Sequence, residues 1–164
     1  VVGCRGAEVA QAARRAASGE SVEAADNDNR LVVAENPAWE AGMLGSIQAG
    51  LGLVRSAAFF AMNGDMPLVP ATAYRLLARE RAARERSGLA DAAFFASSGG
   101  RPGHPVLVPS AWIPEILELG RDDRMKRFLD GRPCVLVEAG TQAVLADIDT
   151  PEEYRKTIEP GDRH

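Results

Sequence analysis

The chain has 164 residues, of which 46% are hydrophobic and 26% are charged, with a formal net charge of −4 at pH 7. This balance is typical of one soluble globular domain, and dispersed arginines in an acidic chain argue against a nucleic-acid-binding surface. No apolar run approaches membrane-spanning length. The cysteines (Cys4, Cys134) and histidines (His104, His164) cannot make a Cys/His zinc site or a disulfide framework. We therefore expect a cytoplasmic protein that binds neither nucleic acid nor membrane.

The N-terminal region begins with Val1-Val2-Gly3, which has the pattern of the last residues of a buried strand. Natural domains rarely begin inside a core strand, so we expect that sequence upstream of Val1 is missing from this chain. An alanine-rich helix is predicted over Gly6–Ala17, closed by Ser18-Gly19. A polar turn at Asp26–Asn29 precedes the predicted strand Leu31–Ala34.

Apolar strand patterns alternate with helix patterns through the rest of the chain. Such alternation indicates an α/β fold with a mostly parallel sheet covered on both faces. We expect one domain over residues 1–158 and a tail over 159–164. The remaining predicted strands are Ser56–Ala61, Ala92–Ala96, Pro105–Val108, Cys134–Val137 and Val144–Ala146, and the predicted helices are Ser46–Val54, one starting at Pro70, Trp112–Leu119, Met125–Leu129 and one starting at Pro151.

A carboxylate follows the strand pattern Ser56–Ala61, in the turn Gly64-Asp65 that precedes Pro67. Residues just beyond the carboxyl end of a strand are where α/β proteins present side chains to ligands. A carboxylate there suits Mg²⁺, which usually takes one or two protein carboxylates and leaves the rest of its shell to water and phosphate. The alternative interpretation of this turn is an ordinary loop between a strand and a helix.

A second acidic segment, Asp147-Ile148-Asp149-Thr150-Pro151, also follows an apolar stretch and precedes a predicted helix. Carboxylates one residue apart point to opposite sides of an extended backbone, so one of them can face the same cleft as Asp65. Alternatively, Asp149 or Thr150 caps the last helix. The two interpretations are compatible for different aspartates.

Two further loops carry weaker patterns. The glycine-spaced segment Asn36–Gly50 leads into a helix, and Gly42 and Gly45 in it allow close approach of an anion or a ribose to backbone amides. Trp39 in that segment is interpreted as a packing residue. Between two predicted strands lies Arg101–Pro105, where Gly103 allows close approach and His104 can donate a hydrogen bond, although a lone loop histidine is more often structural.

Taken in this order, the four segments resemble the MobA-like nucleotidyltransferases, in particular the molybdenum cofactor cytidylyltransferase branch. The resemblance runs from about Val1 to Tyr154. The segments that carry it are Asn36…Gly42-Met43…Ser46…Gly50-Leu51, Gly64-Asp65-Met66-Pro67-Leu68-Val69, Gly103-His104-Pro105-Val106 and Asp147-Ile148-Asp149-Thr150-Pro151-Glu152.

The resemblance implies a Rossmann-like three-layer α/β/α fold that binds a nucleoside triphosphate with Mg²⁺ as cofactor. It implies transfer of a nucleoside monophosphate from CTP or GTP to the phosphate of a molybdopterin-like acceptor, with a molybdoenzyme apo-protein as a further partner. Asp65 would be the catalytic residue and principal metal ligand, and Asp147 or Asp149 would complete the metal site. Nucleotide or acceptor contacts are implied for Asn36, Gly42, Met43, Ser46, Gly64, Pro67, Gly103 and His104.

The chain departs from the family pattern in two places. The family's N-terminal strand and glycine-rich loop with an arginine and a lysine would lie before Val1, and without that loop we expect an inactive polypeptide. Asp122-Asp123-Arg124-Met125 stands where relatives tend to carry Gly-Asp and a small residue before the arginine. Two alternatives stay open: a non-catalytic binding or scaffold domain of the same fold, and a sugar-phosphate nucleotidyltransferase. A Rossmann-like oxidoreductase is disfavoured, since no G-x-G-x-x-G follows a strand pattern.

Overall fold

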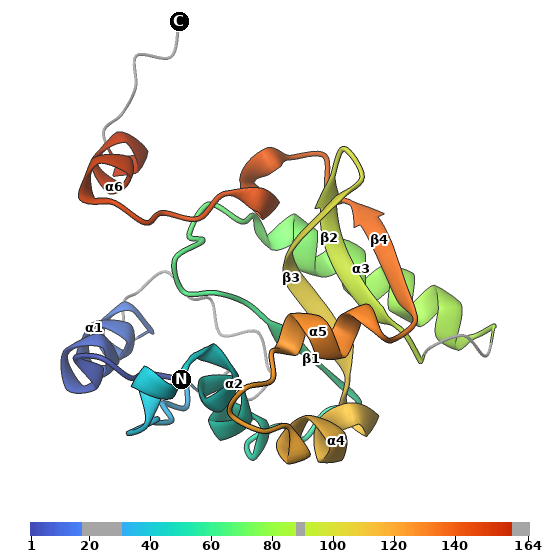
Figure 1. Ribbon diagram of the computed structural model, residues 1–164. Coiled ribbons are helices and arrows are strands. Elements are labelled where there is room, and N and C mark those ends of the chain that lie inside the picture. Colours follow the sequence, from blue (N-terminus) through green and yellow to red (C-terminus); the bar gives the residue numbers. More distant parts are fainter. Residues whose placement is uncertain (18–30, 88–90, 159–164) are drawn as a thin grey trace, which may run out of the picture. The chain divides into compact units, whose positions relative to one another are not determined.

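The computed structural model describes residues 1–17, 31–87 and 91–158 (Figure 1). The chain forms two compact units, one from Val1–Arg55 with Ile113–Phe128 and the other from Ser56–Trp112 with Leu129–His164. The predicted turn Asp26–Asn29, the helix stop Ser18-Gly19 and the tail 159–164 lie outside the described residues. Within the described ranges, no helix is both long enough and apolar enough to cross a bilayer.

The second unit is built on a four-stranded sheet of order β1-β3-β2-β4. Its strands are β1 (Ala58–Ala61), β2 (Ala93–Ser98), β3 (Arg101–Pro109) and β4 (Cys134–Glu138). β4 pairs parallel with β2, whereas β3 pairs antiparallel with both β1 and β2. Three of these strands therefore run in one direction. β3 runs in the other because the tight turn at Gly99 and Gly100, both with positive φ, folds β2 directly back into it.

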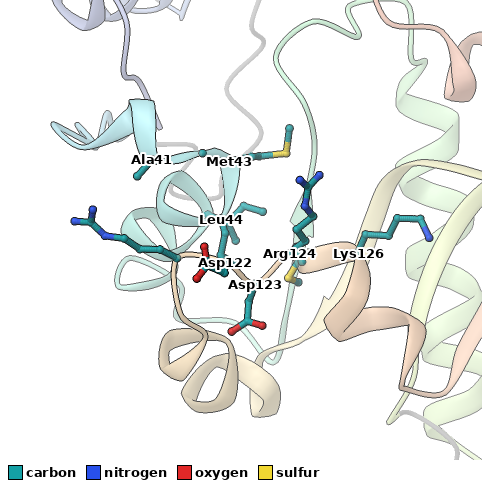
Figure 2. Close-up of a pocket in the computed structure, with 11 residues that line it drawn as sticks. Ala41, Met43, Leu44, Asp122, Asp123, Arg124 and Lys126 are labelled. Atoms are coloured by element: carbon teal, nitrogen blue, oxygen red, sulfur yellow. The ribbon is translucent and has the colours of Figure 1, made fainter.

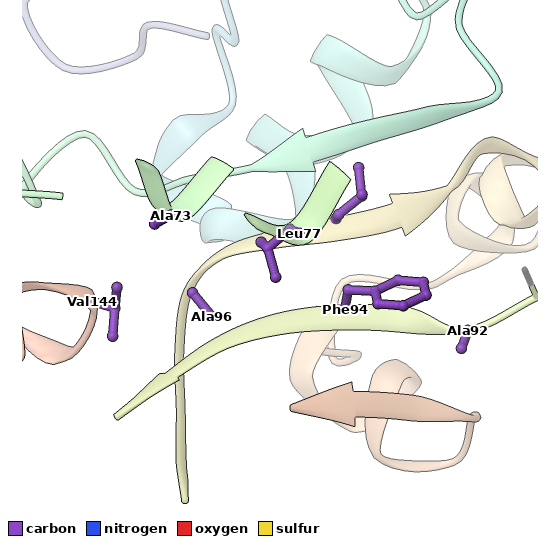
Figure 3. Close-up of a cluster of buried hydrophobic side chains, with 7 residues drawn as sticks. Ala73, Leu77, Ala92, Phe94, Ala96 and Val144 are labelled. Atoms are coloured by element: carbon purple, nitrogen blue, oxygen red, sulfur yellow. The ribbon is translucent and has the colours of Figure 1, made fainter. Parts of the chain in front are cut away.

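The core of this unit lies between the sheet and the helix α3 (Ala71–Glu85) (Figure 3). Leu77 of α3 and Phe94 of β2 are completely buried in it. Val144, from the 3₁₀ helix η3 (Gln142–Leu145), is also completely buried and belongs to the same core. The other buried members of this cluster are Ala73, Ala92, Ala96 and Leu107.

The residues that alternate with this cluster on the central strands face the other side of the sheet. Ala93 and Val108 there have no exposed surface, and Val106 is 3% exposed. Burial on both faces is the property of a sheet covered on both sides, and it explains why these strands are apolar runs without alternation. The expected α/β fold class is confirmed, but the sheet is mixed and not mostly parallel, since β3 pairs antiparallel with both of its neighbours.

Two segments of the second unit differ from the sequence-based prediction. The predicted strand Val144–Ala146 is wrong: Val144 and Leu145 form the second half of η3, and Ala146 caps it. Val144 is buried by packing on the core and needs no neighbouring strand to pair with. Arg101–Gly103, predicted as a loop, belongs to β3, because the hairpin turn lets Ser98 and Arg101 pair at once. The predicted helix at Pro70 is confirmed as α3, and its charged end carries Arg81–Glu85 and Arg84–Glu80 ion pairs.

The first unit is mainly helical. It contains α1 (Gly6–Ala17), which has the predicted bounds, η1 (Trp39–Ala41), α2 (Met43–Leu51), α4 (Ile113–Glu118) and the first residues of α5 (Met125–Asp130). The predicted strand Leu31–Ala34 is wrong: the structure has only an isolated parallel bridge between Val2 and Glu35. The bridge does not extend because the chain turns at Cys4 and Arg5, only two residues after Val2.

One side chain joins two helices of the first unit. The side-chain amide of Gln48 on α2 donates to the carbonyl oxygens of Ile116 (2.9 Å) and Leu119 (3.0 Å), at the C-terminal end of α4. Carbonyls at a helix end lack partners within the helix, so a side chain that satisfies two of them stabilises both the end and its position.

Replacing Gln48 with alanine should therefore lower the free energy of unfolding by about 1–3 kcal/mol, since a half-buried pair of carbonyls loses its donor. The measurement is urea denaturation followed by circular dichroism. Gln142→Ala is the matched control, because Gln142 is exposed and should change stability by less than about 0.5 kcal/mol. Equal effects of the two substitutions would contradict the role given to Gln48.

Candidate functional site

The turn after β1 carries the first predicted site residues. Gly64, Asp65 and Pro67 are exposed, and Met66 between them is 6% exposed and anchors the turn. The main-chain carbonyl of Asp65 accepts a hydrogen bond of 2.8 Å from the amide of Ile148. This bond places the Asp65 turn directly beside the second acidic segment, although the two are more than 80 residues apart in the chain.

The second acidic segment connects η3 to the last helix, α6 (Pro151–Ile158). Asp147 and Asp149 are both exposed. Neither they nor Asp65 form a side-chain hydrogen bond or ion pair with any other part of the chain that the structure describes. Their carboxylates are therefore open to a ligand from solution.

The helix cap at α6 is formed by Thr150 and Glu153. Thr150 Oγ1 accepts from the amide of Glu153 (3.2 Å), while Oε2 of Glu153 accepts from the amide of Thr150 (2.8 Å). This is a capping box, in which the first and fourth residues satisfy each other's amides. Of the two residues considered for the cap, Thr150 makes it, and the carboxylate of Asp149 is not used.

Glu153 makes two more bonds. Its Oε2 also accepts from Thr150 Oγ1 (2.8 Å) and from the amide of Asp149 (3.1 Å). These donors favour the ionised carboxylate, so the hydrogen bonds from Thr150 and then Asp149 lower the pKa of Glu153 below its ordinary value.

The donor set of the two acidic turns fits a hard divalent cation. Exposed carboxylate oxygens in adjoining turns are the ligands that Mg²⁺ takes, usually one or two at a time. Among residues 1–17, 31–87 and 91–158, no group of three or more His, Cys, Asp or Glu side chains is arranged to hold a metal ion. The protein would therefore supply one or two carboxylates, and a bound phosphate and water would supply the rest.

Gly103 and His104 lie inside β3 and face different surroundings. A Cβ at Gly103 would overlap the carbonyl oxygen of Val144 and lie 2.9 Å from Leu145 Cδ2. The close approach that only glycine allows here is thus to the backbone of η3. His104 is half-buried, and its Nδ1 is buried without a hydrogen-bond partner among the described residues. Ligand contacts of this pair remain a prediction.

In the first unit, Asn36 and Ser46 are bonded to each other. Asn36 is 6% exposed, its Nδ2 donates to Ser46 Oγ (3.0 Å), and its Oδ1 accepts from the amide of Ala38 (3.0 Å). These bonds tie the loop before η1 to α2. They give both residues a structural role, and contact of either with a nucleotide or acceptor remains a prediction.

Gly42 and Met43 line a cavity of about 480 Å³ in the same unit (Figure 2). Gly42 has φ of 115°, which favours glycine, and no side chain caps α2 there. Met43 is 63% exposed. Figure 2 shows Met43 and Leu44 on one wall and Asp122, Asp123 and Arg124 on the facing segment. The remaining lining residues are Ala41, Ile47, Arg121, Met125 and Lys126.

The charges of this cavity come from three cations and two carboxylates. Asp123 is engaged, since its Oδ2 accepts from the amide of Gly120 (2.8 Å). Arg121 and Arg124 have no side-chain partner within the described part of the chain. The first turn of an uncapped helix and two available guanidinium groups suit an anionic ligand.

Sequence reasoning missed two features of these sites. The capping role of Glu153 could have been found, because Thr150-x-x-Glu153 has the spacing of a capping box. The juxtaposition of Arg121 and Arg124 with Gly42 could not, because it joins segments almost 80 residues apart and no local pattern encodes it.

Comparison with known proteins places this chain in a family. The model of the MobA-like NTP transferase domain matches residues 4–139. The chain is 26% identical over 128 residues to the molybdenum cofactor cytidylyltransferase of Escherichia coli (strain K12), covering 78% of this chain but only 62% of that relative. The crystal structure of Rv0371c from Mycobacterium tuberculosis H37Rv has a similar fold, with a TM-score of 0.57 and 24% identity, over 92% of this chain and 72% of that one. The family match spans most of the chain, which therefore belongs to the MobA-like NTP transferase domain family.

Proposed function

We propose that the protein is a Mg²⁺-dependent nucleotidyltransferase that moves a nucleoside monophosphate from CTP or GTP to a phosphorylated, molybdopterin-like acceptor. The observation that carries this proposal is the 2.8 Å hydrogen bond from Ile148 to Asp65, which brings the two predicted acidic segments together. Family membership and the similarity to a molybdenum cofactor cytidylyltransferase support the reaction class.

In the proposed reaction, a phosphate oxygen of the acceptor attacks the α-phosphorus of the triphosphate. A new P–O bond forms there as the bond between the α-phosphorus and its bridging oxygen breaks, and pyrophosphate leaves. A divalent cation, when bound, neutralises charge on the phosphates. Asp65 and either Asp147 or Asp149 would hold the cation, and their fixed turns would orient the phosphates.

We further propose that the cavity beside Gly42 and Met43 binds an anionic group of the acceptor or the nucleotide. The free amides at the start of α2 and the side chains of Arg121 and Arg124 supply hydrogen-bond donors and positive charge to it. Asp122 lines the same cavity, and its carboxylate would repel a negatively charged group placed beside it. The anionic group of a bound ligand would therefore have to lie away from Asp122.

The test is pyrophosphate release by the purified protein, produced together with the segment that we expect upstream of Val1, in the presence of Mg²⁺, molybdopterin and either CTP or GTP. The proposal expects release that needs both the metal and the acceptor, and the preferred triphosphate would identify the base. Saturable binding of nucleotide or molybdopterin without pyrophosphate release would favour the binding or scaffold alternative. Release with a sugar phosphate, and none with molybdopterin, would favour the alternative that the protein is a sugar-phosphate nucleotidyltransferase.

Replacing Arg124 with alanine should raise the KM of the anionic ligand bound by the cavity about tenfold, since one charge-assisted contact is lost. The kcat should change little. Arg79→Ala removes the same charge from an exposed residue of α3 that does not line the cavity, and it serves as the control. Unchanged KM values for both triphosphate and acceptor in the Arg124 variant would contradict the proposed ligand site.

A further inference from the structure

The main chain around Asp149 is held at three consecutive amides. The amide of Ile148 donates to the carbonyl oxygen of Asp65 (2.8 Å). The amides of Asp149 (3.1 Å) and Thr150 (2.8 Å) both donate to Oε2 of Glu153. With hydrogen bonds on both sides of Asp149, the direction of its Cα–Cβ bond is fixed before any ligand arrives.

A helix cap alone does not account for all of these contacts. A capping box requires only that the carboxylate of the fourth residue accept from the amide of the first, which here is the bond from Thr150 to Glu153. The bond from the amide of Asp149 lies one residue before the cap and is not part of the capping box. It restrains the residue that carries one of the three predicted metal-binding carboxylates.

We propose that Glu153 is a positioning residue, which holds the main chain of Asp149 so that its carboxylate is ready to bind a divalent cation beside Asp65. This inference rests on the proposed function. Groups that orient metal ligands without touching the metal commonly change metal affinity about 10- to 100-fold when removed. Bonds from amides to an ionised carboxylate are suited to this task because they are stronger than bonds between neutral groups.

The experiment measures Mn²⁺ binding to the protein by electron paramagnetic resonance of the free ion. Glu153→Ala should weaken Mn²⁺ binding about tenfold, and Glu153→Gln should weaken it less, because the amide oxygen still accepts hydrogen bonds. Glu152→Ala is the control. It removes one negative charge from the same turn, and within the described part of the chain Glu152 forms a single ion pair, at 3.9 Å with Arg155, between two exposed groups.

The kinetic readout separates positioning from stability. In the Glu153 variants the concentration of Mg²⁺ needed for half-maximal activity should rise, while kcat at saturating Mg²⁺ is largely retained. Circular dichroism of each variant checks that α6 is still formed. If Glu153→Ala unfolds this helix, the comparison of Glu153→Gln with the wild type still tests the positioning role.

Two results would overturn the inference, and they differ. If Glu153→Ala and Glu152→Ala bind Mn²⁺ as tightly as the wild type while Asp65→Asn does not, the metal site stands and Glu153 is only a helix cap. If the wild type and Asp65→Asn bind Mn²⁺ equally, the proposed metal site itself is wrong and the positioning role falls with it.

Discussion

Replacing Gly103 with alanine should lower the free energy of unfolding by about 3 kcal/mol and the Tm by about 10 °C. The new Cβ would overlap the carbonyl oxygen of Val144 and press on Leu145. A flexible side chain could move aside to remove such an overlap, but the overlapped atom here belongs to the backbone of η3. Val144 is completely buried in the core, so η3 cannot move away without opening a cavity.

The measurement is thermal unfolding followed by circular dichroism. Gly64→Ala is the matched control, since a Cβ at Gly64 meets nothing within 4 Å. Its Tm should shift by less than about 2 °C. If Gly103→Ala is as stable as this control, η3 does not pack on β3 as the structure has it.

The substitution Asp65→Asn should reduce kcat/KM for nucleotide transfer by about 100-fold or more. A metal ion stabilises the transferring phosphates by several kcal/mol, and every 1.36 kcal/mol corresponds to about a factor of ten. Stability should hardly change, because the side chain is exposed and the bond that Asp65 makes to Ile148 uses its main chain.

Pyrophosphate release and thermal unfolding of the same preparation test both halves of this expectation. Asp91→Asn is the control, since Asp91 is an exposed carboxylate of the same unit that has no predicted role. Wild-type activity in the Asp65 variant would show that the carboxylate is not a metal ligand. A large loss of stability would show instead that the turn depends on its charge.

Locally encoded features were predictable from the sequence. The bounds of α1 follow from an alanine-rich periodic segment, and β2 and β4 follow from short apolar runs bounded by turn residues. The Asp65 turn was predictable for the same reason, because Gly64 and Pro67 are turn-forming residues that follow β1 within a few positions. Such patterns depend only on neighbouring residues, and they were sufficient for the α/β fold class.

The tertiary structure decided the features that depend on distant partners. Val144 is apolar whether it lies in a strand or in η3, and only packing against Leu107 and its neighbours distinguishes the two. The turn at Gly99 and Gly100 sets the direction of β3. The apolar pattern of Pro105–Val108 predicts a strand but does not indicate its direction.

The candidate site shows the same division. Composition and spacing identify Asp65, Asp147 and Asp149 as carboxylates of the right kind at the right places in the chain. The contact between their two segments is a main-chain hydrogen bond from Ile148 to Asp65, which no pattern of side chains in the sequence predicts. Sequence by itself determined which chemical groups are present, whereas only the tertiary structure determined which of them meet, because burial and hydrogen-bond satisfaction are settled between segments far apart in the chain.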